Sequence, residues 1–231
     1  MTKKWVKDEL RKNRLENAVI SSIKYAKENR NNIYVVIVSV IVIFLFIGVV
    51  VKNRGKETIA ASKLLAFAQL DFDRFNYDAA IKKIDNIEET FKTTSVIPQA
   101  LYFKGLSYYR KGNHEQAREI LEKCIGFRKN KIEPEARLSL ATVCEEMGKY
   151  EDALEHYNNI KDDHYLKPEA LMGMARIYEL TKRTEEAIDV YTKVQSHYVN
   201  TYWGNLAGMR LYAFGIGPKE TEKITPEIDF N

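Results

Sequence analysis

The run of apolar residues from Ile33 to Val51 constrains this chain more than any other stretch. It holds nineteen residues without a charge, and only Tyr34 and Ser39 carry polar side-chain groups. As a helix with a rise of about 1.5 Å per residue, the run spans roughly 28 Å, close to the ~30 Å hydrocarbon core of a bilayer. Core helices of soluble domains rarely continue this long without a polar face. The run therefore predicts a transmembrane helix at residues 33–51.

The flanks of this run favour an uncleaved signal anchor over a cleaved signal peptide. A signal peptide has a short basic leader, an apolar run of about 7–15 residues and small residues soon after it. Here 32 residues precede the run, and Lys52, Arg54 and Lys56 follow it. The nearest small residues, Ala60 and Ala61, lie beyond those charges.

Basic charge gathers around the apolar run. Residues 1–32 contain nine Lys or Arg and four Asp or Glu, whereas residues 57–231 contain 24 basic and 28 acidic residues. The acidic balance of the larger part removes the main electrostatic argument for nucleic-acid binding. We expect residues 1–32 to form a basic cytoplasmic arm that lies on an anionic leaflet, touches another membrane protein, or is solvated. The positive-inside rule and the length of the downstream part place that part outside the cytoplasm.

The part after the apolar run contains an internal repeat. Ala117, Ala153 and Ala187 occupy matching positions 36 and then 34 residues apart, and a looser copy places Ala80 37 residues before the first of them. An alanine at this position allows a neighbouring helix to approach closely. Small residues recur in the same way earlier in each copy, at Ala68, Gly105, Ala141 and Ala175.

Start and turn signals recur in phase with these small residues. Pro98, Pro134 and Pro168 begin three of the copies, as is typical of the first turn of a helix, where a missing N–H has no cost. Gly112 and Gly148 lie where a tight turn between two helices requires a positive φ. The repeating unit is therefore a helix, a turn and a second helix.

This unit resembles the tetratricopeptide repeat, a helix-turn-helix of about 34 residues. The resemblance implies an all-α chain, in which one N-terminal transmembrane helix is followed by an α-solenoid at residues 61–215. Two positions depart from the pattern, since Lys104 replaces an apolar residue and Cys144 a tyrosine, and the first copy lacks the turn glycine. The expected segments are a linker at 52–60, repeats at about 61–94, 98–131, 134–167 and 168–201, a capping helix at 202–214 and a flexible tail at 216–231.

Motifs for catalysis, metal binding or cofactor binding are not found in the sequence. It has no phosphate-binding glycine loop, no zinc-binding His-Glu-x-x-His and no nucleophile elbow, so we predict that the chain is not an enzyme and has no cofactor. Cys124 and Cys144 fall at core-facing positions of neighbouring helices. They are either two buried thiols or, in an oxidising compartment, a disulfide.

In a tetratricopeptide solenoid, defined positions of each first helix line an inner groove. Large apolar groups mixed with a few charges suit a groove that binds a peptide or an extended segment, although an ordinary solvated face would also look like this. Chaperone co-factors that clamp a C-terminal carboxylate use Lys and Asn at such positions, and this chain has neither there. The candidate groove residues are Leu65, Gln69, Phe72, Tyr102, Leu106, Tyr109, Arg110, Leu138, Thr142, Glu145, Met172, Arg176 and Glu179.

The whole layout resembles bacterial single-pass inner-membrane proteins with a basic cytoplasmic arm and an extracytoplasmic tetratricopeptide domain. The best-known members are ancillary subunits of the SecYEG translocon. The resemblance implies a membrane-tethered scaffold for protein–protein interaction, with translocon or periplasmic chaperone components as partners. One alternative is a structural coordinator of an envelope or cell-division complex that acts through self-association. Another is a cytosol-facing receptor of opposite topology. The identity of the partner and the oligomeric state stay open.

Overall fold

The computed structural model describes residues 16–17, 19–21, 24–25, 27–128 and 130–217. In this part of the chain the only regular secondary structure is helix. Much of the expected basic arm and all but two residues of the expected tail lie outside the described residues. The chain divides into two compact units, Met1–Glu57 and Thr58–Asn231.

The apolar run lies within α2 (Arg30–Asp73), a helix of 44 residues. Among the described residues, α2 is the one helix that is long and apolar enough to cross a membrane, and none of its most apolar window is buried. Phe44 and Phe46 are 70% and 69% exposed. The Ser39 hydroxyl donates a hydrogen bond to the Val35 carbonyl oxygen at 2.8 Å, so its polar group is satisfied within the helix. Length and composition alone are a weak indication of a membrane span.

Residues 52–60, expected as a linker, are helical and belong to α2. The segment contains no proline, and its single glycine, Gly55, costs only about 1 kcal/mol in a helix. Because helix propagation is far easier than nucleation, a short polar stretch between two helical regions continues the helix. The boundary between the two compact units nevertheless falls inside this stretch, after Glu57.

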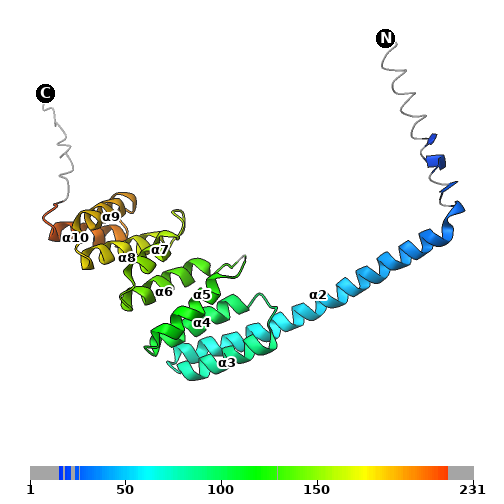
Figure 1. The fold of residues 1–231 in the computed structure, drawn as a ribbon, viewed down its shortest axis with the longest axis horizontal. Helices are drawn as coiled ribbons and strands as arrows, with labels where there is room; N and C mark the ends of the chain where they lie inside the picture. The colour runs from blue at the N-terminus through cyan, green and yellow to red at the C-terminus, as the bar shows by residue number, and fades with distance from the viewer. Residues whose placement is uncertain (1–15, 18, 22–23, 26, 129, 218–231) are drawn as a thin grey trace, which may run out of the picture. The chain divides into compact units, whose positions relative to one another are not determined.

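The second unit is a succession of antiparallel helix pairs (Figure 1). The first helix of the first pair is the part of α2 that begins at Thr58. A single helix follows the fourth pair, in the region expected to cap the solenoid. The other first helices are α4 (Ile97–Arg110), α6 (Glu133–Glu146) and α8 (Lys167–Leu180), the second helices are α3 (Tyr77–Thr90), α5 (His114–Ile125), α7 (Tyr150–Asn158) and α9 (Thr184–His197), and the final helix is α10 (Tyr202–Ala213).

In each pair, the turn has a residue with a positive φ at the same position. Gly112 and Gly148 have φ of 77° and 73°, and at the matching positions of the first and fourth pairs Phe75 and Lys182 have φ of 62° and 61°. The turn persists without glycine because the next N–H bonds back into the first helix, as Arg183 does to the Tyr178 carbonyl at 2.8 Å. A side chain in this conformation is strained.

We expect Lys182→Gly to stabilise the solenoid by about 1 kcal/mol, because glycine adopts a positive φ without the steric cost that a Cβ imposes. The reciprocal change Gly148→Lys should destabilise it by a similar amount. Chemical denaturation of the full chain in detergent measures both. Equal midpoints for the two variants would contradict the argument.

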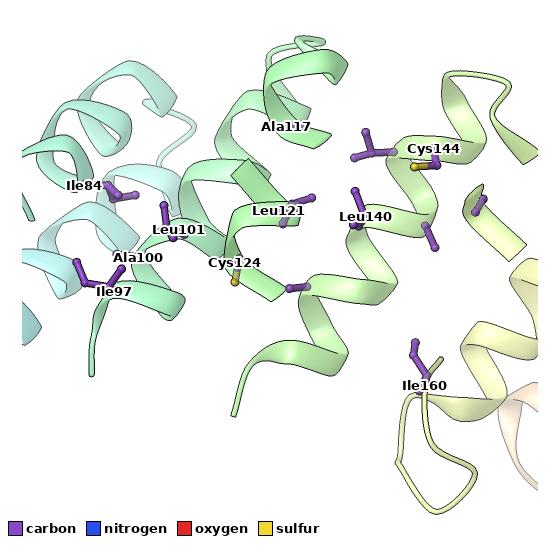
Figure 2. Packing of buried hydrophobic residues seen from close by; sticks show 14 of the residues in the cluster. Ile84, Ile97, Ala100, Leu101, Ala117, Leu121, Cys124, Leu140, Cys144 and Ile160 are labelled. Atoms are coloured by element: carbon purple, nitrogen blue, oxygen red, sulfur yellow. The ribbon is translucent and has the colours of Figure 1, made fainter. Parts of the chain in front are cut away.

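Small residues and large apolar side chains alternate in a core that runs along the helix pairs (Figure 2). The core consists of two clusters that meet at α8: Ala170 and Ile177 pack into the first cluster, whereas Leu171 and Ala175 pack into the second. The small residues predicted to permit close packing are all fully buried, namely Ala68, Ala80, Gly105, Ala117, Ala141, Ala153, Ala175 and Ala187. This confirms the repeat phase.

The departure at Lys104 is explained by two carboxylates. Its ammonium group lies 2.5 Å from the Glu88 carboxylate and 2.7 Å from that of Asp85, and the side chain is only 12% exposed. Burial alone would raise the pKa of Glu88, but hydrogen bonds from Lys104 and Lys123 outweigh it and lower the pKa. The position is thus filled by a paired charge between α3 and α4 in place of an apolar side chain.

Cys124 and Cys144 are free and fully buried. The Cys124 thiol donates to the Pro98 carbonyl oxygen at 3.1 Å, and burial raises its pKa to about 11. Both residues therefore act as small core side chains with little thiolate character.

Candidate functional site

The first helices of successive pairs lie next to each other. Within the described residues α4 contacts α6, α6 contacts α8 and α8 contacts α10, whereas the second helices α3, α5, α7 and α9 do not contact one another in this way. Closer spacing of the first helices makes their side the inner side of the solenoid. We call the thirteen candidate groove residues on this side the inner surface.

The inner surface is mostly half-buried. Leu65 and Met172 are only 4% and 6% exposed and belong to the core, which corrects the expectation that they line an open groove. Leu65 packs within the first core cluster and Met172 within the second. Arg110 and Arg176 are exposed, and the other nine residues are partly buried.

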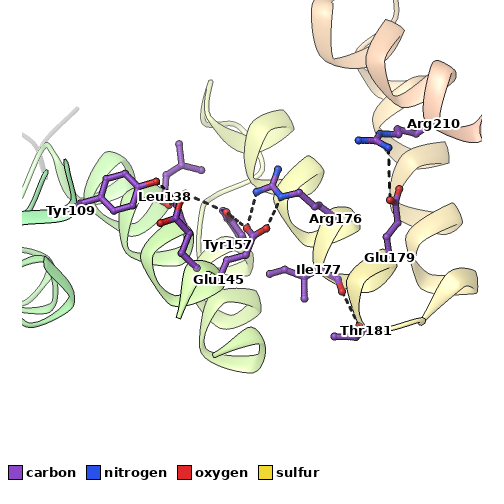
Figure 3. A network of polar contacts seen from close by, with 11 residues as sticks. Tyr109, Leu138, Glu145, Tyr157, Arg176, Ile177, Glu179, Thr181 and Arg210 are labelled. Atoms are coloured by element: carbon purple, nitrogen blue, oxygen red, sulfur yellow. Dashed lines mark hydrogen bonds and ion pairs between the residues drawn. The ribbon is translucent and has the colours of Figure 1, made fainter. Parts of the chain in front are cut away.

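A polar network joins three first helices in the C-terminal half of this surface (Figure 3). The Glu145 carboxylate of α6 accepts hydrogen bonds from Arg176 of α8, at 2.5 Å from Nε and 2.7 Å from Nη2. The Tyr157 hydroxyl donates to the same carboxylate at 3.1 Å. Farther along, the Arg210 guanidinium of α10 lies 3.9 Å from the Glu179 carboxylate of α8. The charges of this half are thus paired with one another.

These contacts shift the pKa values of the groups that make them. The hydrogen bond to Glu145 raises the pKa of Arg176, and burial raises the pKa of Tyr157 to about 12. Burial and a 2.6 Å hydrogen bond to Glu146 raise the pKa of Tyr109 to about 12. At neutral pH both tyrosines therefore stay protonated and act as hydrogen-bond donors.

The N-terminal half of the inner surface is aromatic and apolar. The ring of Phe72 in α2 meets that of Phe103 in α4 edge to face at 5.7 Å, and Tyr102 meets Phe103 at 5.5 Å. Tyr102 and Leu138 pack partly on the core, while Leu106 is partly buried without belonging to it. This half presents apolar side chains between α4 and α6, with the exposed Arg110 at its edge.

Several residues that complete these contacts lie outside the groove positions predicted from the sequence. Glu146, Arg210, Phe103 and Tyr157 are not among the predicted groove residues. The available signal was Tyr157 itself, because a buried tyrosine hydroxyl requires a hydrogen-bond partner. No signal indicated that Arg176 would pair with a carboxylate 31 residues earlier.

The described residues contain no group of three or more His, Cys, Asp or Glu placed to hold a metal ion. The inner surface has apolar side chains in one half and an internally paired polar network in the other.

Comparison with protein families matches two overlapping segments. The family described as "Anaphase-promoting complex, cyclosome, subunit 3" matches residues 73–160, and a tetratricopeptide repeat family matches residues 138–197. No curated protein matches the chain.

Solved structures with the same fold come from different kinds of protein. MamA from Desulfovibrio magneticus RS-1 is 16% identical with a TM-score of 0.54, covering 68% of this chain and 86% of its own. A putative kinesin light chain repeat protein from Podosopora anserina is 14% identical with a TM-score of 0.55, covering 67% and 86%. PilF from Pseudomonas aeruginosa is 15% identical with a TM-score of 0.52, covering 65% and 66%. At these levels of sequence identity, the similarity shows a shared fold and no more.

The helix pairs are therefore tetratricopeptide repeats, and the chain is a tetratricopeptide repeat protein with an α-solenoid fold. Such repeats typically form scaffolds for protein–protein interaction without catalytic activity.

Proposed function

We propose that this protein is a membrane-tethered scaffold whose repeats lie outside the cytoplasm and bind protein segments during translocation or envelope protein handling. The observation that carries the proposal is the uncharged run of residues 33–51, directly upstream of an interaction solenoid. A scaffold fixed to a membrane at its N-terminal side holds its binding surface near chains that emerge there.

The inner surface suggests the chemistry of the segment that binds. The charges around Glu145 are already paired, so a partner gains little by replacing those contacts. The apolar side chains between α4 and α6 have no such internal partner. We therefore propose that an extended segment with apolar or aromatic side chains binds over Leu106, with Arg110 contributing at the edge.

Topology is the first test of the proposal. A reporter that is active only outside the cytoplasm is fused after Asn231 in a bacterial host. Activity supports the extracytoplasmic location. An inactive reporter, together with activity of a cytoplasmic one at the same position, would contradict it.

Position-specific crosslinking tests the surface. A photo-crosslinking residue at Leu106 is expected to capture membrane or extracytoplasmic proteins, whereas the same residue at Glu119, exposed on the second helix α5, is the matched control. Leu106→Glu should weaken binding of a captured segment at least tenfold, because a charge then faces its apolar side chains. Equal capture from both positions would contradict a role for the inner surface.

A further inference from the structure

The final helix, α10, has the register of a first helix in a further repeat. Gly204, Ala207 and Leu211 are buried, and they lie 34 residues after Ala170, Gly173 and Ile177, which are buried in α8. The α8 residues face α7, and the α10 residues face α9. Helix α10 therefore continues the solenoid as a first helix.

Within the described part of the chain, no helix covers the side of α10 that would face a second helix, which we call the open side. In α8 the corresponding positions hold Leu171 and Ala175, which are 4% and 0% exposed because α9 covers them. In α10 these positions hold Asn205 and Met209, and Met209 is 68% exposed. Tyr212, one turn farther, is 72% exposed. The outer side of α10 is thus apolar, whereas a solenoid side that faces solvent normally has a polar outer face.

The open side is not shaped for an ordinary second helix. Every preceding repeat has alanine or glycine at the position of Met209, which is what lets its second helix approach closely. Methionine keeps an incoming helix farther away. A helix that packs here must interdigitate with large side chains, as helices do in a coiled-coil seam.

The residues of the open side are suited to pack against the same residues of a second copy. Tyr202, Asn205, Met209 and Tyr212 are spaced three, four and three residues apart, the a/d spacing of a heptad, and carry no charge. The Asn205 amide both donates and accepts, so it can pair with the same residue of a second copy. Beside Met209 the surface is hollowed by a cavity of about 660 Å³ next to Gly208, which offers space for a methionine side chain.

The exposed area sets the strength of such pairing. At about 150–250 Å² for each large side chain, the exposed parts of Val199, Tyr202, Met209 and Tyr212 amount to on the order of 500 Å² per copy. A standard stable interface buries about 800 Å² per partner. The face is thus comparable to the largest apolar patches on monomers, which are often functional, and small for a permanent dimer, as suits an association that depends on concentration in the membrane.

We propose that α10 is a homodimerisation helix, which pairs with α10 of a second copy through Tyr202, Asn205, Met209 and Tyr212. The pairing leaves the inner surface of each copy free. It is independent of which protein segments the inner surface binds.

Disulfide crosslinking of the full chain in its membrane tests the pairing. Asn205→Cys is expected to give a crosslinked species of twice the chain mass, and Glu119→Cys, on α5, should give none. The native thiols do not interfere, since Cys124 and Cys144 are buried. A crosslinked species whose mass shows a different protein, or a chain that stays monomeric at every concentration, would overturn the proposal.

Two charge variants in the Asn205→Cys background identify the face. Met209→Glu should reduce the crosslinked fraction at least tenfold, with circular dichroism unchanged because Met209 is exposed. Phe67→Glu changes another exposed apolar residue, 59% exposed and in the first repeat, and should leave the crosslinked fraction unchanged. Loss with Phe67→Glu would indicate head-to-tail stacking. Persistence with Met209→Glu would place the contact elsewhere, and either result overturns the assignment to α10.

Discussion

Replacing Gly204 by alanine is expected to detach α10 from the end of the solenoid. A Cβ at Gly204 would lie 2.1 Å from the carbonyl oxygen of Tyr198 and 2.9 Å from its carbonyl carbon. Both atoms are backbone and cannot rotate away as a side chain can, so the helix must move. Movement also breaks the N-terminal cap, in which the Thr201 hydroxyl accepts from the Gly204 N–H at 3.1 Å. We expect a loss of about 3 kcal/mol in the stability of α10, at the upper end of overpacking effects.

Gly208→Ala is the matched control in the same helix. Its Cβ would lie 2.9 Å from the Nε2 atom of Gln195, the end of a flexible and partly exposed side chain that can move. Alanine also gains up to about 1 kcal/mol in helix propensity over glycine, so the net effect is expected to be small.

Hydrogen exchange of the full chain measures both variants. Amides of α10 should exchange about a hundredfold faster in Gly204→Ala than in the native chain, because local opening becomes easier. In Gly208→Ala their protection should be close to native. Equal protection of α10 in the two variants would show that the contact with Tyr198 does not hold the helix.

The sequence predicts the repeat fold well because the repeat pattern depends on contacts between helices that are close in the sequence. Close approach of two helices requires a small residue at a fixed place, and Ala117 or Ala153 shows that place directly. Residues 52–60, expected only as a linker, continue the helix. A helix continues or ends according to the segments on either side of it.

The sequence predicts which positions belong to the candidate site, but not the contacts between their side chains. The repeat phase assigns Glu145 and Arg176 to one side of the solenoid, but it does not give the rotation that brings their side chains together. For the same reason Leu65 and Met172 were placed on the surface, although neighbouring helices bury them. Gly173 was equally uninformative, since the reason for it lies in Tyr157, a residue of the preceding repeat.

Tyr157→Ala is expected to be the most damaging single change in the solenoid. The side chain is 2% exposed, and its ring fills the space left by Gly173, where a Cβ would lie 2.5 Å from the ring. Its hydroxyl donates to Glu145 at 3.1 Å. Truncation opens a cavity between α7 and α8 and should cost about 3–5 kcal/mol, as for other large-to-small changes of buried aromatic residues.

Tyr157→Phe separates the packing of the ring from the hydrogen bond. It keeps the ring against Gly173 and removes only the hydroxyl, so we expect a loss of about 1 kcal/mol. Because α8 joins the two core clusters, the alanine variant should also uncouple them, and denaturation of the full chain should then show two transitions where the native chain shows one. A single transition with equal losses for both variants would mean that the hydroxyl, and not the ring, couples the two halves of the solenoid.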